Sequence, residues 1–141
     1  MITLNRLNWA TGTAPMVDGS VGIIMMNATN DAATTVLSSS VAVSGANSNN
    51  KFYSNTIQNC NIGIALIGYA DVAPFTYADY GNDVGGTSAA TGNTIINYGG
   101  GALATNPATG IRTLAQYDFN ASYNTINNNT GAGVNHVSTL R

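Results

Sequence analysis

Apolar positions along the chain fall in short runs that are rich in β-branched residues. The runs cover residues 21–26, 34–43, 62–67 and 94–96. Gly, Asn, Thr and Ser separate the runs, and these residue types favour turns or compete with helical hydrogen bonds. Short apolar runs between turn residues are typical of β-strands. The pattern therefore predicts an all-β chain without an α-helix.

Two elements recur three times, a phrase Asn-Thr-Ile-x-Asn and, after it, a glycine-led apolar run. The phrases are residues 55–59, 93–97 and 124–128, and the runs are residues 63–66, 110–114 and 133–137. Self-similarity at a spacing of tens of residues indicates a repeat architecture. We expect successive turns of the chain to lie on one another, with Ile57, Ile95 and Ile126 in one internal stack.

The spacing of the copies predicts the length of one coil. Asn55 precedes Gly63 by 8 positions, and Gly110 precedes Asn124 by 14. These two shortest intervals together give a repeat of about 22 residues, which suits a β-solenoid. The longer spacings leave 16 extra positions within 69–92 and nine within 99–109. In a solenoid, insertions project from the corners between strands. Crossovers between parallel strands are usually right-handed. We predict a right-handed parallel β-helix with coils of about 22 residues and two corner-loop insertions.

Alternation along the strands predicts which side chains face the interior. The inward set is Ile64, Leu66, Ile111 and Val134, and the outward set is Ala65, Arg112 and Asn135. Asn59, Asn97 and Asn128 share one offset in the repeated phrase. We expect them at a bend, with their amides bonded along the stack or to the turn backbone. The alternative is that they occupy exposed turns.

The chain is interpreted as a single β-helix domain spanning residues 1–141, and as a fragment of a longer polypeptide. Repeats are clear in residues 51–141, whereas residues 1–50 form poorly phased N-terminal coils. The last residues stop within a coil, which leaves a solenoid end open. We expect that end to meet flanking coils of a parent chain or another copy. Cys60 has no partner for an internal disulfide and is expected to be a small, partly buried side chain.

Charge is scarce, with four basic residues, six acidic residues and a net charge of −2. The apolar fraction is ordinary, so the composition is not that of a disordered chain. A basic patch for nucleic acid is absent from the sequence. No apolar run approaches the length of a membrane helix, and we expect no membrane insertion.

The repeated phrase and its Gly-Ile-x-Leu follower resemble the repeat of right-handed parallel β-helices of the pectin-lyase-like superfold. Residues 52–66, 71–75, 110–114 and 133–141 further resemble very long secreted surface proteins of gliding bacteria that use type IX secretion. This resemblance implies an extracellular or cell-surface location and a structural or adhesive function. The alternative that it implies is a carbohydrate-active β-helix enzyme, such as a polysaccharide lyase or glycosidase, or a glycan-binding module.

The expected long loop at residues 69–92 is the first candidate for a binding site. Its candidate side chains are Asp71, Phe75, Tyr77, Asp79, Tyr80 and Asp83. Aspartates could hold calcium through hard oxygen ligands, and aromatic faces could stack on the sugars of polysaccharides or cell-surface glycans. No cofactor is otherwise expected. The alternative is that the aromatic residues form the loop's own small core and the aspartates are solvated.

Arg112 is the basic residue of a well-phased strand, and it is expected to point outward. Asp118 lies six residues later. Neighbouring coils place Ala65 and Asn135 at the offset of Arg112, so no charged row forms. A lyase needs several carboxylates or cations that converge on one groove. We therefore expect no catalysis, and we keep Arg112 as a candidate for binding or for tying down a nearby loop.

Overall fold

The computed structural model describes residues 1–3, 20–26, 43–98 and 109–127, which form an all-β structure with one short 3-10 helix, η1 (Val43–Gly45). Every strand pairing found within these residues is parallel. Each sheet joins strands from successive turns of the chain. This arrangement is that of a stack of parallel coils, as the recurring phrase predicts.

The two larger parallel sheets carry the recurring phrase and its glycine-led follower. One has the order β1 (Ile2–Thr3), β4 (Thr56–Gln58), β8 (Thr94–Ile96) and β12 (Thr125–Asn127). The other has the order β2 (Val21–Met26), β5 (Ile62–Ile67) and β9 (Thr109–Leu114).

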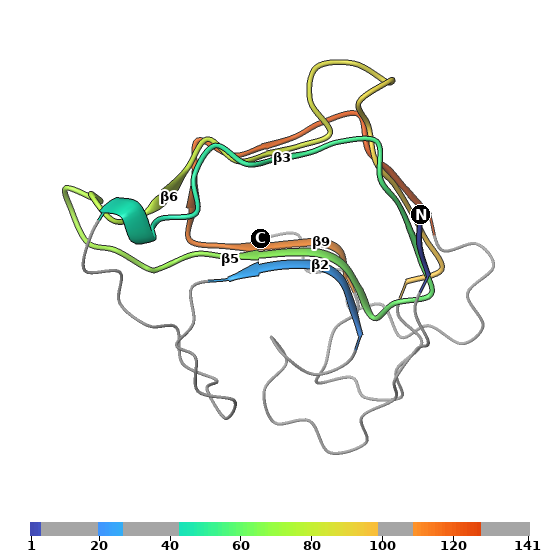
Figure 1. Ribbon diagram of the computed structural model, residues 1–141, viewed down its shortest axis with the longest axis horizontal. Helices are drawn as coiled ribbons and strands as arrows, with labels where there is room; N and C mark the ends of the chain where they lie inside the picture. The colour runs from blue at the N-terminus through green and yellow to red at the C-terminus, as the bar shows by residue number, and fades with distance from the viewer. Residues whose placement is uncertain (4–19, 27–42, 99–108, 128–141) are drawn as a thin grey trace.

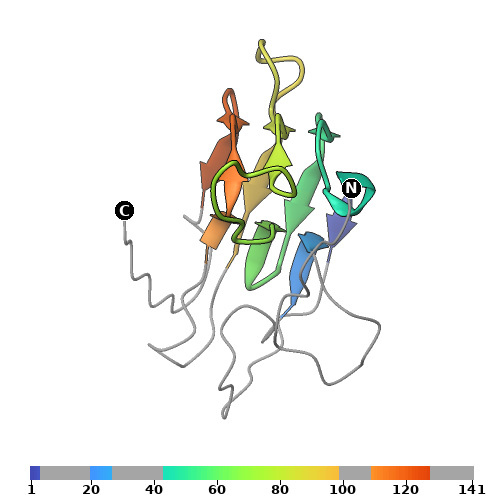
Figure 2. The ribbon, with the colours of Figure 1, turned by 90° about the vertical axis from the view of Figure 1, so that its left-hand side faces the viewer.

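Two further sheets are built from strands of only two residues each. One consists of β3 (Lys51–Phe52), β7 (Asp83–Val84) and β11 (Asn120–Ala121), and the other of β6 (Asp79–Tyr80) and β10 (Gln116–Tyr117). Figure 1 looks along the stack, where the strand β3 lies across the interior from β2, β5 and β9. Figure 2, seen from the side of β6, shows the coils next to one another in chain order.

The predicted isoleucine stack is confirmed. Ile57 is in register with Ile95, and Ile95 with Ile126. Ile57 and Ile95 are completely buried, in one cluster with Ile64 and Leu66. Ile126 belongs to the last described strand of its sheet and is 44% exposed. Burial of a branched aliphatic side chain contributes about 1.5–3 kcal/mol, so the stack is a main source of stability.

The predicted alternation holds for residues 64–67 of β5, but Ile62, two positions before Ile64, lies with the outer side chains. The outer face is not open to solvent there. Ala65 lies in a second cluster with Ile62 and Ile67, apart from Ile64 and Leu66. All of these side chains are completely buried. Both faces of β5 are therefore covered, which explains its continuous apolar sequence. The expected orientations of Val134 and Asn135 fall outside the described residues.

The asparagines of the phrase lie at the corners, as expected. Asn59 has a φ of 58° and Asn97 a φ of 53°, which is the left-handed conformation that Asn tolerates. A ladder of amides lies four residues earlier in the phrase. Asn55 Nδ2 donates to Asn93 Oδ1 at 2.9 Å, and Asn93 Nδ2 donates to Asn124 Oδ1 at 2.8 Å. A ladder through Asn59, Asn97 and Asn128 stays a prediction, because Asn128 lies outside the described residues.

The interpretation of residues 69–92 as one loop is wrong. The short strands β6 and β7 lie within it and pair with β10, and with β3 and β11. They divide the interval into one loop at residues 68–78 and another at residues 85–93, which projects from the stack in Figure 1. Strands of two residues show no periodicity, so the sequence pattern does not reveal them. The second predicted insertion falls mainly in residues 99–108, which lie outside the described part.

Other expectations concern the N-terminal part and Cys60. β1 and β2 add one strand each to the sheets that contain β4 and β5. The run at residues 34–43 lies outside the described part except for Val43, which begins η1. Cys60 is completely buried in the core, rather than partly buried as expected.

Candidate functional site

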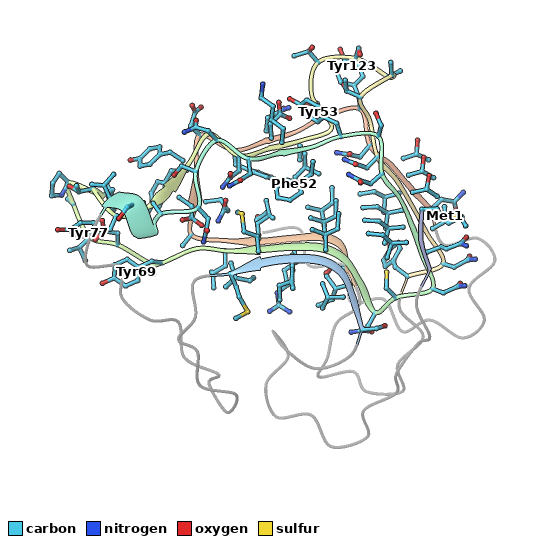
Figure 3. The ribbon with its side chains drawn as sticks, in the orientation of Figure 1. Met1, Phe52, Tyr53, Tyr69, Tyr77 and Tyr123 are labelled. Atoms are coloured by element: carbon cyan, nitrogen blue, oxygen red, sulfur yellow. The ribbon has the colours of Figure 1, made fainter. Side chains whose placement is uncertain are left out.

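The structure distributes the seven candidate side chains over one loop and three strands. Asp71, Phe75 and Tyr77 belong to the loop at residues 68–78; the others lie on β6, β7 and β9, in the order Asp79, Tyr80, Asp83 and Arg112. Figure 3 shows Tyr69 and Tyr77 at the end of the molecule where this loop leaves the stack. Only part of the predicted set therefore shares one location.

Asp71 organises the loop from within. Its Oδ1 accepts a hydrogen bond from the Val72 backbone N–H at 2.8 Å, and its Oδ2 accepts one from the Tyr77 backbone N–H at 2.8 Å. A carboxylate that bonds nearby backbone donors is a common turn device. Both oxygens of Asp71 thus hold the path of the loop.

Three aromatic rings meet where this loop touches the stack. The Tyr117 ring centroid lies 5.1 Å from that of Phe75 and 5.4 Å from that of Tyr80. Tyr80 and Tyr117 are in register on β6 and β10, and Tyr80 is 40% exposed. We call Phe75, Tyr80 and Tyr117 the aromatic corner. Ring pairs at such distances contribute about 0.5–1.5 kcal/mol beyond their burial.

Tyr117 is the functional candidate that the sequence reasoning missed. Its register partner Tyr80 lies in another coil, and Gln116 hydrogen-bonds Asp79 across 37 positions of sequence. That spacing differs from the spacings of 38 and 31 between the recurring asparagines. Only the placement of β6 and β10 in one sheet, which the sequence pattern does not show, identifies the pair.

Asp79 faces the interior, on the opposite side of β6 from Tyr80. Its side chain is completely buried. Oδ1 accepts from the Asn47 backbone N–H at 2.8 Å, and Oδ2 accepts from Gln116 Nε2 at 3.0 Å. Gln116 Oε1 in turn accepts from Asn82 Nδ2 at 2.7 Å. A buried carboxylate costs several kcal/mol unless it is hydrogen-bonded, so Asp79 belongs to a structural polar network.

Asp83 ties the loop at residues 85–93 to Tyr53, which directly follows β3, and to Asn120 on β11. Its Oδ2 accepts from the Tyr53 hydroxyl at 2.6 Å, and its Oδ1 accepts from the Gly86 backbone N–H and from Asn120 Nδ2, both at 2.8 Å. The hydrogen bond from Tyr53 is the largest cause of a lowered Asp83 pKa; those from Asn120 and Gly86 and the Lys51 charge act in the same direction, against burial. The same bond raises the pKa of Tyr53.

A pH profile tests this contact. The folded-state pKa of Asp83 is depressed, so its contribution to stability is present above the unfolded pKa of about 3.9 and is lost as pH falls further. The pKa of Tyr53 is raised, so its contribution is present below about pH 10 and is lost as pH rises through the folded value. We expect Tyr53→Phe to reduce the fall in unfolding free energy at both the acid and the alkaline end of the profile, measured by urea unfolding between pH 2.5 and 11.5.

Tyr123→Phe serves as the matched control for that profile. Tyr123 is 58% exposed and lies on the turn before β12, away from Asp83 along the chain. Its hydroxyl makes no part of the contact with Asp83, and the profile should keep its shape. Identical acid limbs for Tyr53→Phe and the parent protein would contradict the assigned role of the Tyr53 hydroxyl.

Arg112 lies on β9 in register with Ala65, whose partner on β2 is Ile24. The row across these three strands thus contains one cation and two apolar residues. Arg112 is partly buried, and desolvation lowers the pKa of its guanidinium. Asp118 is exposed at a corner with a φ of 49°. Asn135, which the sequence places at the same offset as Arg112, lies outside the described residues.

Within the described ranges, no three His, Cys, Asp or Glu side chains converge in a way that could hold a metal ion. The aspartates of the first candidate region instead bond separate partners, as described for Asp71, Asp79 and Asp83. The same ranges contain no helix long and apolar enough to cross a bilayer.

Comparisons of the chain with protein-family models, with curated proteins and with solved structures gave no match. The functional argument therefore depends on the geometry of the molecule. That geometry combines a rigid stack of parallel strands with one corner at which aromatic rings from a loop and two coils meet.

Proposed function

We propose that the chain is a segment of a right-handed parallel β-helix with a basic coil of about 22 residues, a period in the range of solenoid repeats. Lys51 pairs with Asp83, 32 positions on, and Asp83 with Asn120, 37 positions on. Both spacings exceed the proposed coil, and the excess lies in the linkers between strands. The handedness rests on the usual sense of parallel crossovers.

The strand bounds support the proposed coil length. The linker from β5 to β6 covers residues 68–78, whereas Ala115 alone separates β9 from β10, so the first coil has ten extra positions there. In the second coil, the linkers before β8 and β9 exceed those before β4 and β5 by six and nine positions. Without these extra positions both proposed coils come to about 22 residues, which supports the proposed period.

We propose that this segment serves as a structural and adhesive part of a secreted or cell-surface bacterial protein, and that the aromatic corner contacts glycans. The observation that carries the glycan contact is the grouping of Phe75, Tyr80 and Tyr117 on a rigid scaffold. Aromatic rings offer apolar faces, and tyrosines add a hydrogen-bonding tip. Loops held by a rigid framework commonly carry binding functions. Location and secretion route rest on the sequence resemblance.

Exposure at the C-terminal side of the stack supports contacts with further coils. Ile126 and Leu114 are each 44% exposed, whereas their register partners Ile95 and Ile67 are completely buried. Each lies on the last described strand of its sheet. We propose that flanking coils of a longer parent chain, or a second copy, cover this side.

The alternative, a carbohydrate-active enzyme, draws less support from the outer face. The row of Ile24, Ala65 and Arg112 places one cation among apolar neighbours. General acid-base chemistry on a sugar chain uses paired carboxylates or a base with charged companions. The arrangement at β9 thus favours a non-catalytic function, and a calcium-dependent lyase mechanism would need ligands beyond those found together in the described ranges.

Glycan binding tests the proposal. On an array of bacterial and plant polysaccharides, we expect binding by the parent protein and about a tenfold loss of affinity for Tyr117→Ala, because covering the apolar face of one aromatic ring contributes on the order of 1.5 kcal/mol and about 1.4 kcal/mol corresponds to a factor of ten. Tyr80→Ala should weaken binding as well. Tyr123→Ala, at an exposed tyrosine outside the aromatic corner, is the control and should bind normally.

Circular dichroism and urea unfolding of each variant separate loss of binding from loss of fold. Failure of the folded parent protein to bind any polysaccharide would reject the glycan contact. Binding that survives Tyr117→Ala and Tyr80→Ala would place the contact elsewhere on the molecule.

A further inference from the structure

We infer that the aromatic corner takes an uncharged polysaccharide and discriminates against acidic chains such as polyuronates. This inference rests on the proposed glycan contact and specifies its ligand class. It follows from how the rings are held and from which charges the neighbouring segments carry.

The backbone that carries two of the rings is held in place before any ligand arrives. The Phe75 backbone N–H donates to the Val72 carbonyl at 2.8 Å, which fixes the turn that presents the ring. The Tyr80 backbone N–H donates to Ser48 Oγ at 2.9 Å, and its carbonyl accepts from Asn49 N–H at 2.8 Å. A site with a fixed backbone loses little entropy on binding, so apolar contact with a neutral sugar face can suffice for affinity.

The segments that carry the rings are acidic. Residues 68–81 and 115–118, which contain the loop, β6 and β10, include the carboxylates of Asp71, Asp79 and Asp118 and no Lys, Arg or His. Asp79 is buried, but Asp118 is exposed and directly follows Tyr117. An acidic chain on these rings would therefore meet negative charge on the surface beside it.

The described basic side chains belong to other strands. Lys51 lies on β3, where its charge contributes to the lowered pKa of Asp83. Arg112 lies within β9 and is partly buried. Recognition of carboxylate or sulfate groups generally uses Arg or Lys at the contact. The elements of the aromatic corner supply none, which selects against anionic ligands.

Matched ligands test the charge preference. A galacturonan oligomer and its methyl ester share one backbone and differ in charge, and β-glucan, xylan and mannan oligomers extend the neutral set. At 20 mM salt we expect the parent protein to bind at least one neutral oligomer at least ten times more tightly than it binds an acidic oligomer of galacturonan or alginate. This difference in affinity should become smaller at 300 mM salt, because screening weakens repulsion between exposed charges.

Asp118→Asn provides the matched variant. Asparagine keeps the size of the side chain and tolerates the φ of 49° at this position. We expect unchanged affinity for the neutral ligand and about a twofold to threefold gain for acidic oligomers at low salt, which is the size of one solvated charge contact. Tyr117→Ala should lower the affinity for the neutral ligand about tenfold in both backgrounds.

The outcomes distinguish the charge preference from the proposed glycan contact on which it rests. Equal binding of acidic and neutral oligomers, weakened in Tyr117→Ala, would overturn the charge preference and leave the glycan contact standing. No response of acidic binding to Asp118→Asn or to salt would equally overturn it. Absence of binding to every oligomer by the folded protein would overturn both.

Discussion

Gly63→Ala is expected to destabilise the fold by about 3 kcal/mol, the upper end of the usual cost of overpacking a core, because two coils meet at this glycine. A Cβ at Gly63 would overlap the backbone carbonyl oxygen of Gly110 in the next coil and would lie 2.6 Å from Ile95 Cγ2. Ile95 is completely buried in the core cluster and has no free space in which to turn. The added methyl group must therefore push two coils apart.

Thermal unfolding measures this effect, and a loss of about 3 kcal/mol lowers the Tm by roughly 10 °C for a chain of this size. Gly110→Ala is the matched control. Its Cβ would lie 2.5 Å from Cγ2 of Ile126, a side chain that is 44% exposed at the last described strand and can move aside. We expect a clearly smaller loss there. Equal Tm values for Gly63→Ala and the parent protein would contradict the close approach of the coils.

Asn93→Ala is expected to cost about 2–4 kcal/mol, because Asn93 is the centre of the amide ladder and each buried polar group that loses its partner costs about 1–3 kcal/mol. Its side chain is 1% exposed. Oδ1 accepts from the Asn55 backbone N–H at 3.0 Å and from Asn55 Nδ2 at 2.9 Å, while Nδ2 donates to the Phe52 carbonyl at 2.7 Å. Alanine would leave these partners without the side chain that joins adjacent coils.

Asn124→Ala provides the comparison at the end of the ladder. Asn124 Oδ1 accepts from Asn93, and Asn124 Nδ2 donates to the Val84 carbonyl at 2.8 Å, but the side chain is only partly buried. Water can replace some of the hydrogen bonds of the Asn124 side chain, and we expect the free energy of unfolding to fall by about 1–2 kcal/mol. Urea unfolding of both variants at pH 7 measures the difference. A larger loss for Asn124→Ala than for Asn93→Ala would contradict the central position of Asn93.

The recurring phrase carries most of what the sequence reveals about architecture. Ile57, Ile95 and Ile126 are apolar, β-branched and at equivalent offsets, and stacking them in register removes apolar surface of each from water. Asn59 and Asn97 mark the corners for a similar local reason, since Asn accepts a positive φ. Such features follow from the chemistry of the residue itself and its neighbours in sequence.

The candidate site depends on contacts that no local pattern encodes. Tyr80 and Tyr117 come together because β6 and β10 pair, and strands of two residues have no period to recognise. Asp79 and Tyr80 are adjacent in sequence, yet one is completely buried and the other 40% exposed. Which of the two faces the interior depends on the register of the coil.

The sequence by itself determined the β class, the stacking of the isoleucines and the residues at the corners, because these follow from apolar spacing and backbone preference. Only the tertiary structure decided where the insertions leave the stack, which asparagines bond between coils and which aromatic rings share a corner. The physical reason is that neither apolar spacing nor backbone preference marks these partners, which lie in different coils more than thirty positions apart. Their partners are set by the accumulated lengths of the loops between them, and loop length is weakly constrained by the energy of folding.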